Sequence, residues 1–237
     1  ESRAGVPLLN SLGVHQNHFT TTGDDAIELV YKNRSENLGN GIGVNLRFSQ
    51  YSSVNQEMFG IVRSALQEVA KKKDAPLVPV PISHHSHYQA ASFEEPDSAS
   101  IRRLLAGYDD SSDGGQTLDT PLKVIKQAGN CRVVVTGSYH AGVFALSQGI
   151  PVVGLAKSEY YVDKFLGLAD QFGIGCQTVL LNDQQLRERL VDSITNAWES
   201  SEKWRPQILE SAHRQMELSQ TAYKRVYEMV NSYTSKK

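Results

Sequence analysis

The chain has 237 residues, of which 40% are hydrophobic and 21% are charged, and its 24 Lys and Arg against 26 Asp and Glu give a formal net charge of −2. A chain of this length can bury a sizeable core without a metal or a disulfide. Its near-neutral charge lacks the electrostatic footprint of a duplex DNA binder, so we expect no nucleic-acid partner. No apolar run approaches the roughly 20 residues of a membrane-spanning helix, so we expect no integral membrane segment.

Two further features concern the compartment and the extent of the chain. Cys131 and Cys176 are the only cysteines, too few for a disulfide framework or a cysteine-based zinc site, which favours a reducing compartment. The sequence begins at Glu1 without an initiator Met or a basic-then-apolar leader. We therefore expect part of a longer protein in the cytoplasm, either free or attached peripherally at the inner face of the membrane.

Predicted strands and helices alternate along the chain. Thr120 as N-cap with Pro121 at the first helical position opens one helix, and Asn182 with Gln185 forms a capping box that opens another. We predict strands at residues 42–48, 77–82, 132–136, 150–155 and 178–181, and helices at residues 59–73, 121–127, 141–148, 159–168, 182–198 and 204–233. One more helix, carried by Ile101, Leu104 and Leu105, is predicted within the polar stretch 88–115. This alternation of strands and helices predicts an α/β fold with a Rossmann-like, doubly wound parallel sheet. In such sheets ligands bind at the carboxyl ends of the strands.

Four groups of candidate site residues follow predicted strands. One is the turn Gly137-Ser138-Tyr139-His140 after the third strand. The amides of Ser138, Tyr139 and His140 lie at a helix N-terminus, which suits a phosphate or a carboxylate, and Gly137 lets a ligand approach the backbone. The alternative is structural, with Ser138 as a helix cap and His140 packed at the start of the helix.

The other groups follow the first, second and fourth strands. Arg47 either clamps a carboxylate or phosphate with its planar guanidinium or is a surface residue at a strand end. His84 and His85 suit anion binding or acid–base chemistry, with a solvated loop as the alternative. A zinc site that also used His87 would need a third ligand, and none stands at a diagnostic spacing, so we expect no metal. The last group is Lys157 and Glu159.

These segments carry a resemblance to a known family. The stretch VVVTGSYHAGVFALSQGIPVV at residues 133–153 resembles polysaccharide pyruvyl transferases, in which a strand, a His-bearing turn and an Ala-rich helix ending in Gly-x-Pro recur. LLNSLGV at 8–14 and TGDDA at 22–26 are similar to the segment that closes the family's N-terminal domain. IGVNLR at 42–47 resembles its next strand with a terminal Arg, and His84 and His85 resemble a His that follows the strand after it.

The resemblance implies a GT-B-like fold of two Rossmann-like halves with a cleft between them. Residues 1–35 would be the tail of the N-terminal domain plus a linker, residues 36–200 the C-terminal donor-binding domain, and residues 201–237 helices that pack back toward the N-terminal half. Family members transfer pyruvyl from phosphoenolpyruvate to two sugar hydroxyls as a cyclic ketal, in bacterial exopolysaccharide or cell-wall glycan synthesis. The implied acceptor is a glycan or lipid-linked sugar, no cofactor is implied, and the chain alone would be an incomplete enzyme.

The resemblance also implies roles for the candidate residues. Arg47 would bind a donor anion, and the turn from Ser138 to His140 would serve the phosphate, with His140 there or in the acid role. His84 or His85 would do acid–base work.

Two positions depart from the family pattern. Family members commonly carry an Arg two residues before the motif His, where this chain has Ser138. Lys157 is out of register with the family's later Lys, because Tyr160 or Tyr161 occupies that neighbourhood. The charge for the donor would then come from Lys157 or Arg47, or the donor would be a different anionic compound.

Two other functions stay open at this point. A GT-B glycosyltransferase would bind the diphosphate of a nucleotide sugar at the same helix N-terminus, with Glu159 on the ribose. A non-catalytic domain that keeps the fold is favoured by Ser138 in place of the family's Arg, since fold does not imply activity.

Overall fold

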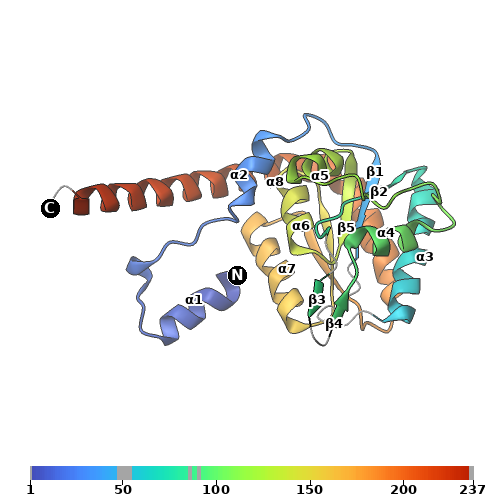
Figure 1. The fold of residues 1–237 in the computed structure, drawn as a ribbon, viewed down its shortest axis with the longest axis horizontal. Helices are drawn as coiled ribbons and strands as arrows, with labels where there is room; N and C mark the ends of the chain where they lie inside the picture. The colour runs from blue at the N-terminus through green and yellow to red at the C-terminus, as the bar shows by residue number, and fades with distance from the viewer. Residues whose placement is uncertain (1, 47–54, 85–86, 90–91, 235–237) are drawn as a thin grey trace.

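A five-stranded, all-parallel sheet forms the centre of the computed structural model, which describes residues 2–46, 55–84, 87–89 and 92–234. The strand order is β2-β1-β5-β6-β7, and helices cover both faces (Figure 1). These strands are β1 (Gly41–Asn45), β2 (Leu77–Pro79), β5 (Cys131–Thr136), β6 (Val152–Ala156) and β7 (Cys176–Leu180). The predicted Rossmann-like, doubly wound α/β fold is therefore confirmed.

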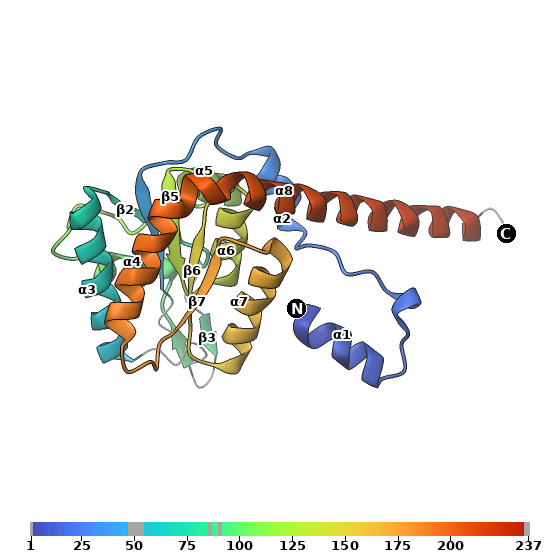
Figure 2. The same cartoon turned by 180° about the vertical axis from the view of Figure 1, so that it is seen from behind.

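The helices are α1 (Ser2–Ser11), α2 (Ala26–Lys32), α3 (Gln56–Lys73), α4 (Asp97–Leu105), α5 (Pro121–Ala128), α6 (Tyr139–Leu146), α7 (Glu159–Phe172) and α8 (Leu186–Thr234), with a 3-10 turn η1 (Gln16–His18). Two layers of helices cover the sheet, and α1 stands outside them, next to α7 (Figure 2). The core on one face contains α3, α4 and the first part of α8, together with Val133 and Val135 of β5. The core on the other face contains α2, α5, α6 and α7, together with Val134. A strand buried on both faces needs apolar residues at every position, which explains the continuous run of valines in β5.

The structure differs from the prediction at the edge strand and in the polar stretch that follows it. β2 ends at Pro79, short of the predicted residue 82, because the next two groups that could continue the ladder bond to side chains instead. The Val80 carbonyl accepts from Asn45 Nδ2 at 2.9 Å, and the Ile82 amide donates to Asp97 Oδ2 at 2.8 Å. An antiparallel hairpin of β3 (His87–Gln89) and β4 (Ser92–Glu94) was not predicted. Three-residue strands are too short to show a hydrophobic alternation in the sequence.

The two helices predicted at the C-terminal end are one continuous helix, α8. It begins at Leu186, and Asp183 Oδ1 accepts a hydrogen bond from the Gln185 amide at 2.8 Å, so the predicted capping box at Asn182 is wrong. Pro206 lies inside α8, which changes direction between a part that packs on the sheet and a part that projects from the body (Figure 2). A proline removes one helical hydrogen bond and crowds the preceding turn, so we attribute the bend to Pro206.

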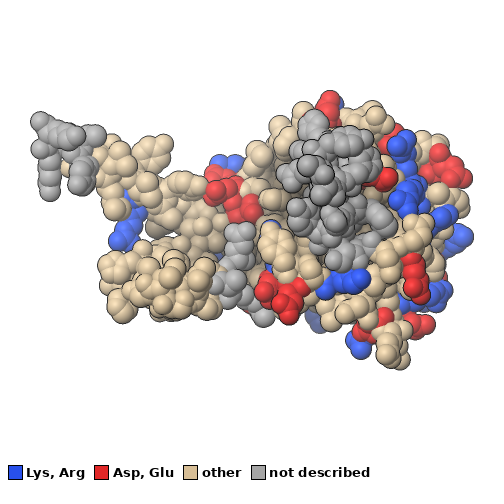
Figure 3. Space-filling view, turned by 60° about the horizontal axis from the view of Figure 1, so that its bottom comes forward, with Lys and Arg blue, Asp and Glu red and all other residues tan. Residues whose placement is uncertain are grey.

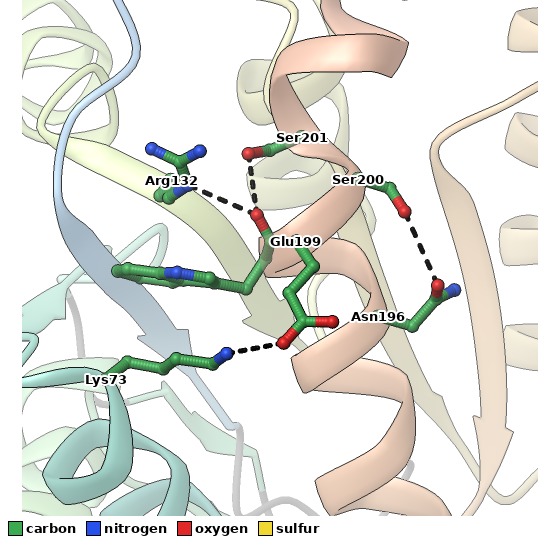
Figure 4. Close-up of polar contacts among 7 residues, drawn as sticks. Lys73, Arg132, Asn196, Glu199, Ser200 and Ser201 are labelled. Carbon is green, nitrogen blue, oxygen red and sulfur yellow. Dashed lines mark hydrogen bonds and ion pairs between the residues drawn. The ribbon is translucent and has the colours of Figure 1, made fainter.

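The first part of α8 is attached to both α3 and the sheet. Lys73 Nζ at the end of α3 donates to Glu199 Oε1 at 2.7 Å, and Arg132 Nε in β5 donates to the carbonyl of Trp198 at 3.2 Å (Figure 4). These contacts fix α8 across the strands rather than at one end of them.

The later part of α8 contacts the segment that precedes β1. Arg205 donates to the carbonyl of Ser35 at 2.7 Å, and the Tyr223 hydroxyl donates to Asp25 Oδ2 at 3.0 Å. One helix therefore connects the sheet to residues 25–35.

Candidate functional site

The strand order reverses beside β1. The chain passes from β1 to β2 on one side and then to β5 on the other, and such a switch point opens a crevice at the carboxyl ends of the two central strands. A cavity of about 200 Å³ lies there, and we call it the switch-point cavity. It is lined by Ile82, Ser83, Asp97, Gly137, Ser138, Tyr139, His140, Tyr161 and Lys164.

One side of this cavity, the strand-end wall, is organised around a buried carboxylate. Asp97, the first residue of α4, is 1% exposed. Its Oδ2 accepts hydrogen bonds from the amides of Ile82 at 2.8 Å and Ser83 at 3.0 Å, and from Asn45 Nδ2 at 2.9 Å. Because Asn45 ends β1 and the other two residues follow β2, Asp97 holds both strand ends against α4. These three donors offset the cost of removing a carboxylate from water.

The same hydrogen-bond network reaches β5 through Thr136. The Thr136 hydroxyl lies 3.5 Å from Asn45 Oδ1 and 3.2 Å from the carbonyl of Ser138, which compete for its one proton, and it accepts from the Ser138 amide at 2.8 Å. The Gly137 amide donates to the carbonyl of Asn45 at 2.9 Å. The amides of Gly137 and Ser138 are thus engaged within the fold, although we expected the Ser138 amide to meet a ligand.

The ligand-facing part of the turn is the start of α6. This helix begins at Tyr139, two residues earlier than predicted, and amides in a first turn have no helical carbonyl to bind. Ser138 occupies the N-cap position but its side chain makes no capping hydrogen bond, and His140 is exposed. The structural alternative is therefore right about the position of Ser138 at the cap of the helix and wrong about His140, which is not packed.

The opposite side of the cavity, the helix wall, includes Tyr161 and Lys164 of α7. Lys164 Nζ lies 5.1 Å from the centroid of the Tyr139 ring and 4.6 Å from that of the Tyr160 ring. The His140 ring contacts Tyr139 edge-on, with 5.5 Å between centroids. Aromatic faces attract an ammonium group, so the two tyrosines hold Lys164 at the cavity. A cation, a histidine and a helix N-terminus together suit an anionic ligand.

The remaining predicted site residues lie elsewhere. His84, Lys157 and Glu159 are described by the structure and do not line the switch-point cavity. His84 is near Asp119, where a hydrogen bond from Lys123 lowers the pKa of the carboxyl and His84 adds a smaller effect of the same sign. Arg47 and His85 lie outside the described residues.

Five residues that build the cavity were not predicted from the sequence: Asn45, Asp97, Thr136, Tyr161 and Lys164. Asn45 and Thr136 are the last residues of their strands, so the rule that ligands bind at strand ends could have found them. Tyr161 and Lys164 lie three residues apart on a predicted helix, which places them on one face of it. Asp97 carries no such signal in the sequence.

The described residues offer little for metal binding, membrane insertion or cysteine chemistry. Within residues 2–46, 55–84, 87–89 and 92–234, no cluster of three or more His, Cys, Asp or Glu side chains could hold a metal ion. No helix of those ranges is long and apolar enough to cross a membrane. Cys131 and Cys176 are both free, and burial raises the pKa of both thiols, that of Cys176 to about 12, so neither has the lowered pKa of a nucleophilic cysteine.

A comparison of the sequence with models of known protein families tests the family resemblance that the sequence indicates. The family model described as polysaccharide pyruvyl transferase matches residues 5–159, more than half of the chain. The chain belongs to the polysaccharide pyruvyl transferase family. A search of the curated proteins finds no significant match to this member of the family.

The family match covers part of the cavity. Its range includes the strand-end wall and the turn from Gly137 to His140, and it ends at residue 159, before Tyr161 and Lys164. The polysaccharide pyruvyl transferase resemblance inferred from residues 133–153 is confirmed. The cation on α7 lies beyond the matched range.

Proposed function

We propose that this chain binds phosphoenolpyruvate in the switch-point cavity and serves the transfer of its pyruvyl group to two hydroxyls of a sugar. Family membership indicates a pyruvyl-transferase-like function. The observation that supports this donor is the presence of His140, the first turn of α6 and Lys164 at one cavity. Phosphoenolpyruvate carries a carboxylate and a phosphate, and both are bound best by cations and N–H groups.

Lys164 compensates for the departure at position 138. Where family members commonly have an Arg, Ser138 brings only a hydroxyl, so the cavity needs a positive charge from another element. Lys164 supplies one from α7, held by Tyr139 and Tyr160. An ammonium is a compact charge without the planar fork of a guanidinium, so we expect it to bind the phosphate as a point charge.

The proposed reaction forms one C–H bond and two C–O bonds. A proton delivered to the methylene carbon of the donor makes it a methyl group and leaves the adjacent carbon electrophilic. One sugar hydroxyl adds to that carbon, and the second displaces phosphate and closes the cyclic ketal. One hydroxyl proton replaces the proton delivered to the donor, and the other leaves with the phosphate.

We assign the proton delivery to His140 and the charge on the departing phosphate to Lys164 and the first turn of α6. Histidine is the side chain used most often for proton transfer near neutral pH. Fixed positive charge near a developing anion lowers the barrier to its departure. Roles for Arg47, His84, His85, Lys157 and Glu159 stay predictions.

We propose a GT-B-like organisation around this domain, with an N-terminal Rossmann-like half and residues 201–237 packing toward it. The projecting part of α8 supports this, because Val226, Tyr227 and Val230 form an exposed apolar stripe along it. The acceptor would be a glycan or lipid-linked sugar in bacterial exopolysaccharide or cell-wall synthesis, and the protein would act in the cytoplasm. In this organisation residues 1–237 alone bind donor and turn over poorly.

Ligand-induced stabilisation tests the donor. Millimolar phosphoenolpyruvate is expected to raise the melting temperature of the chain, whereas uridine and guanosine diphosphates are not, because only a ligand of the folded state stabilises it. A shift with the nucleotides and none with phosphoenolpyruvate would identify a glycosyltransferase instead. No shift with any of them would contradict the proposal and favour a non-catalytic domain.

Turnover tests the role of His140. In the full-length protein, His140→Ala is expected to slow phosphate release from phosphoenolpyruvate by roughly 10²- to 10⁴-fold, the usual worth of a proton-transfer group. His213→Ala, at an exposed position on α8, is the matched control and should leave turnover unchanged. Equal rates for the two variants would remove His140 from the mechanism.

A further inference from the structure

A cavity of about 430 Å³ lies at the end of the sheet opposite to the switch-point cavity. It is lined by Gly129 and Asn130, which precede β5, by Gln148, which precedes β6, and by residues 33–35, which lie between α2 and β1. All five strands are parallel, so their amino ends share the edge of the sheet opposite to their carboxyl ends. Figure 1 shows α2 and α5 at this end, away from the hairpin of β3 and β4. We call it the amino-end cavity.

The charged residues that line the amino-end cavity are both cations. They are Arg34, just beyond the end of α2, and Lys126 in the last turn of α5, and none of the described residues that line it is Asp or Glu. Elsewhere on the surface the two signs are mixed, as in Figure 3, where Lys and Arg lie beside Asp and Glu over the body. Arg34 and Lys126 are both exposed, so a ligand that enters the cavity can reach their charged groups.

A third cation, Arg205 of α8, lies beside Arg34. It donates to the carbonyl of Ser35, which belongs to the cavity wall, at 2.7 Å and to that of Glu36 at 3.1 Å. Burial lowers the pKa of Arg205, and the like charge of Arg34 lowers it further, while Glu202 has a smaller opposite effect. The two guanidinium groups therefore repel each other, and an anion beside Arg34 would offset that repulsion.

The usual reason for cations at such positions is the helix dipole, which accounts for only part of this charge. The helices α2, α5 and α6 end at the cavity, and each C-terminus carries roughly half a negative charge. Arg34 meets one of these ends directly, because its Nη1 donates to the carbonyl of Tyr31 at 2.6 Å. Three helix ends offset roughly one and a half of the three positive charges. The amino-end cavity therefore keeps an excess of positive charge.

The walls of the cavity are fixed by contacts within the fold. The buried side chain of Gln148 donates to the carbonyl of Ile125 at 2.9 Å and accepts from the Ser35 amide at 3.4 Å, which joins the ends of α5 and α6 to the segment before β1. The guanidinium of Arg34 lies 4.0 Å from the centroid of the Tyr31 ring, which holds it at the end of α2. Binding to groups that are already in place costs less conformational entropy.

We infer that the amino-end cavity binds a phosphate group, with Arg34 and Lys126 on its oxygens. A guanidinium can bind two phosphate oxygens at once, and an ammonium adds a compact charge. The volume of the cavity falls within the roughly 300–1,000 Å³ of small-molecule sites, so the phosphate can belong to a soluble organic compound or to a lipid headgroup. This site shares no lining residue with the switch-point cavity and does not depend on the proposed function.

Titration with inorganic phosphate tests the site. Phosphorus NMR is expected to show saturable binding to the unsubstituted chain. The double variant Arg34→Gln/Lys126→Met should weaken this binding by about ten- to a hundredfold, the worth of a charge-assisted contact. Lys224→Met/Arg225→Gln removes the same charges at exposed positions on the projecting part of α8. It is the matched control and should bind phosphate as the unsubstituted chain does.

Two single variants keep the outcomes apart. Arg34→Lys keeps the charge without the planar fork and should bind more tightly than Arg34→Gln, so the test does not depend on one substitution that affects folding. Lys164→Met, in the switch-point cavity, should leave the phosphate binding in place. Absence of saturable binding, or equal affinity in the two double variants, would overturn the inference. Loss of the binding in Lys164→Met alone would also overturn it, because the phosphate would then lie in the switch-point cavity.

Two further ligands identify the source of the phosphate and separate this site from the donor site. Cosedimentation with phosphatidylglycerol vesicles that is lost in the Arg34 and Lys126 double variant would identify a lipid headgroup. Phosphate binding without cosedimentation would identify a soluble compound. The melting shift with phosphoenolpyruvate should survive in this double variant, so failure of the donor proposal and failure of this one are observed with different ligands and different variants.

Discussion

The two walls of the switch-point cavity are held in different ways. On the strand-end wall, Asp97 is buried and accepts three hydrogen bonds from the protein itself, one of them from Asn45. On the helix wall, Lys164 is only partly buried and is held by the faces of aromatic rings. The strand-end wall therefore uses its polar groups to fix the backbone, whereas the helix wall presents a charge to a ligand. Substitutions in the first should cost stability, and substitutions in the second should cost affinity.

The largest expected effect is that of Asp97→Ala. It removes the acceptor of the partly buried amides of Ile82 and Ser83, at about 1–3 kcal/mol for each, while the Asn45 side chain keeps its hydrogen bond to the Val80 carbonyl. The free energy of unfolding, measured by urea denaturation, should therefore fall by about 3 kcal/mol or more. Asp97→Asn keeps one acceptor oxygen and should lose less. A free energy unchanged in Asp97→Ala would show that the strand-end wall does not depend on this carboxylate.

Lys164→Met should show the opposite pattern. Loss of a charge-assisted contact is expected to weaken phosphoenolpyruvate binding by about ten- to a hundredfold, while the free energy of unfolding stays within about 0.5 kcal/mol. Calorimetric titration and urea denaturation of the same samples measure both quantities. Lys203→Met, at an exposed position on α8, is the matched control, and Lys164→Arg should recover part of the affinity. Unchanged affinity in Lys164→Met would exclude this residue from donor binding.

Thr136→Val separates the walls with a smaller change. Valine has nearly the shape of threonine, so the substitution mainly removes the hydroxyl that accepts from the Ser138 amide. We expect the free energy of unfolding to fall by about 1–2 kcal/mol and the phosphoenolpyruvate affinity to fall less than in Lys164→Met. If instead the affinity falls more than the stability, the turn at Ser138 contributes to recognition and the two walls are not distinct.

The smallest effect is expected far from both walls, at the contact between Lys73 and Glu199. The hydrogen bond from Lys73 holds the pKa of Glu199 below its usual 4.5. A lowered pKa in the folded state stabilises at pH values above 4.5 and loses that contribution as the pH falls through the folded value. Lys73→Met should therefore reduce the decline in stability between pH 5 and pH 3, with Lys71→Met as the control. An identical acid unfolding profile in both variants would show that the pair contributes nothing.

The fold could be predicted from the sequence because its signals are local. The valines of residues 133–135 and the apolar runs around them are continuous, as strands buried on both faces must be. Weak local signals failed, as in the three-residue strands of the hairpin at His87–Glu94. The break expected between residues 198 and 204 is absent, because the packing of Trp198 and Trp204 against the core continues the helix across it.

The candidate site could be predicted only in part, for the same reason. The turn from Gly137 to His140 is one stretch of chain, so its place after a strand could be inferred. Asp97 meets Asn45 across 52 residues of sequence, and Lys164 meets Tyr139 across a helix, a strand and a turn. Such pairs are products of tertiary packing, and no spacing in the sequence indicates them.

The continuity of α8 has a consequence for the segment that precedes β1. The same helix contacts α3 and β5 with its first part and Asp25 with Tyr223 on its later part. Asp24, next to Asp25, lines a cavity of about 260 Å³ together with α1, Tyr139 and Gln171. One side of this cavity is therefore anchored to the central sheet through a single helix.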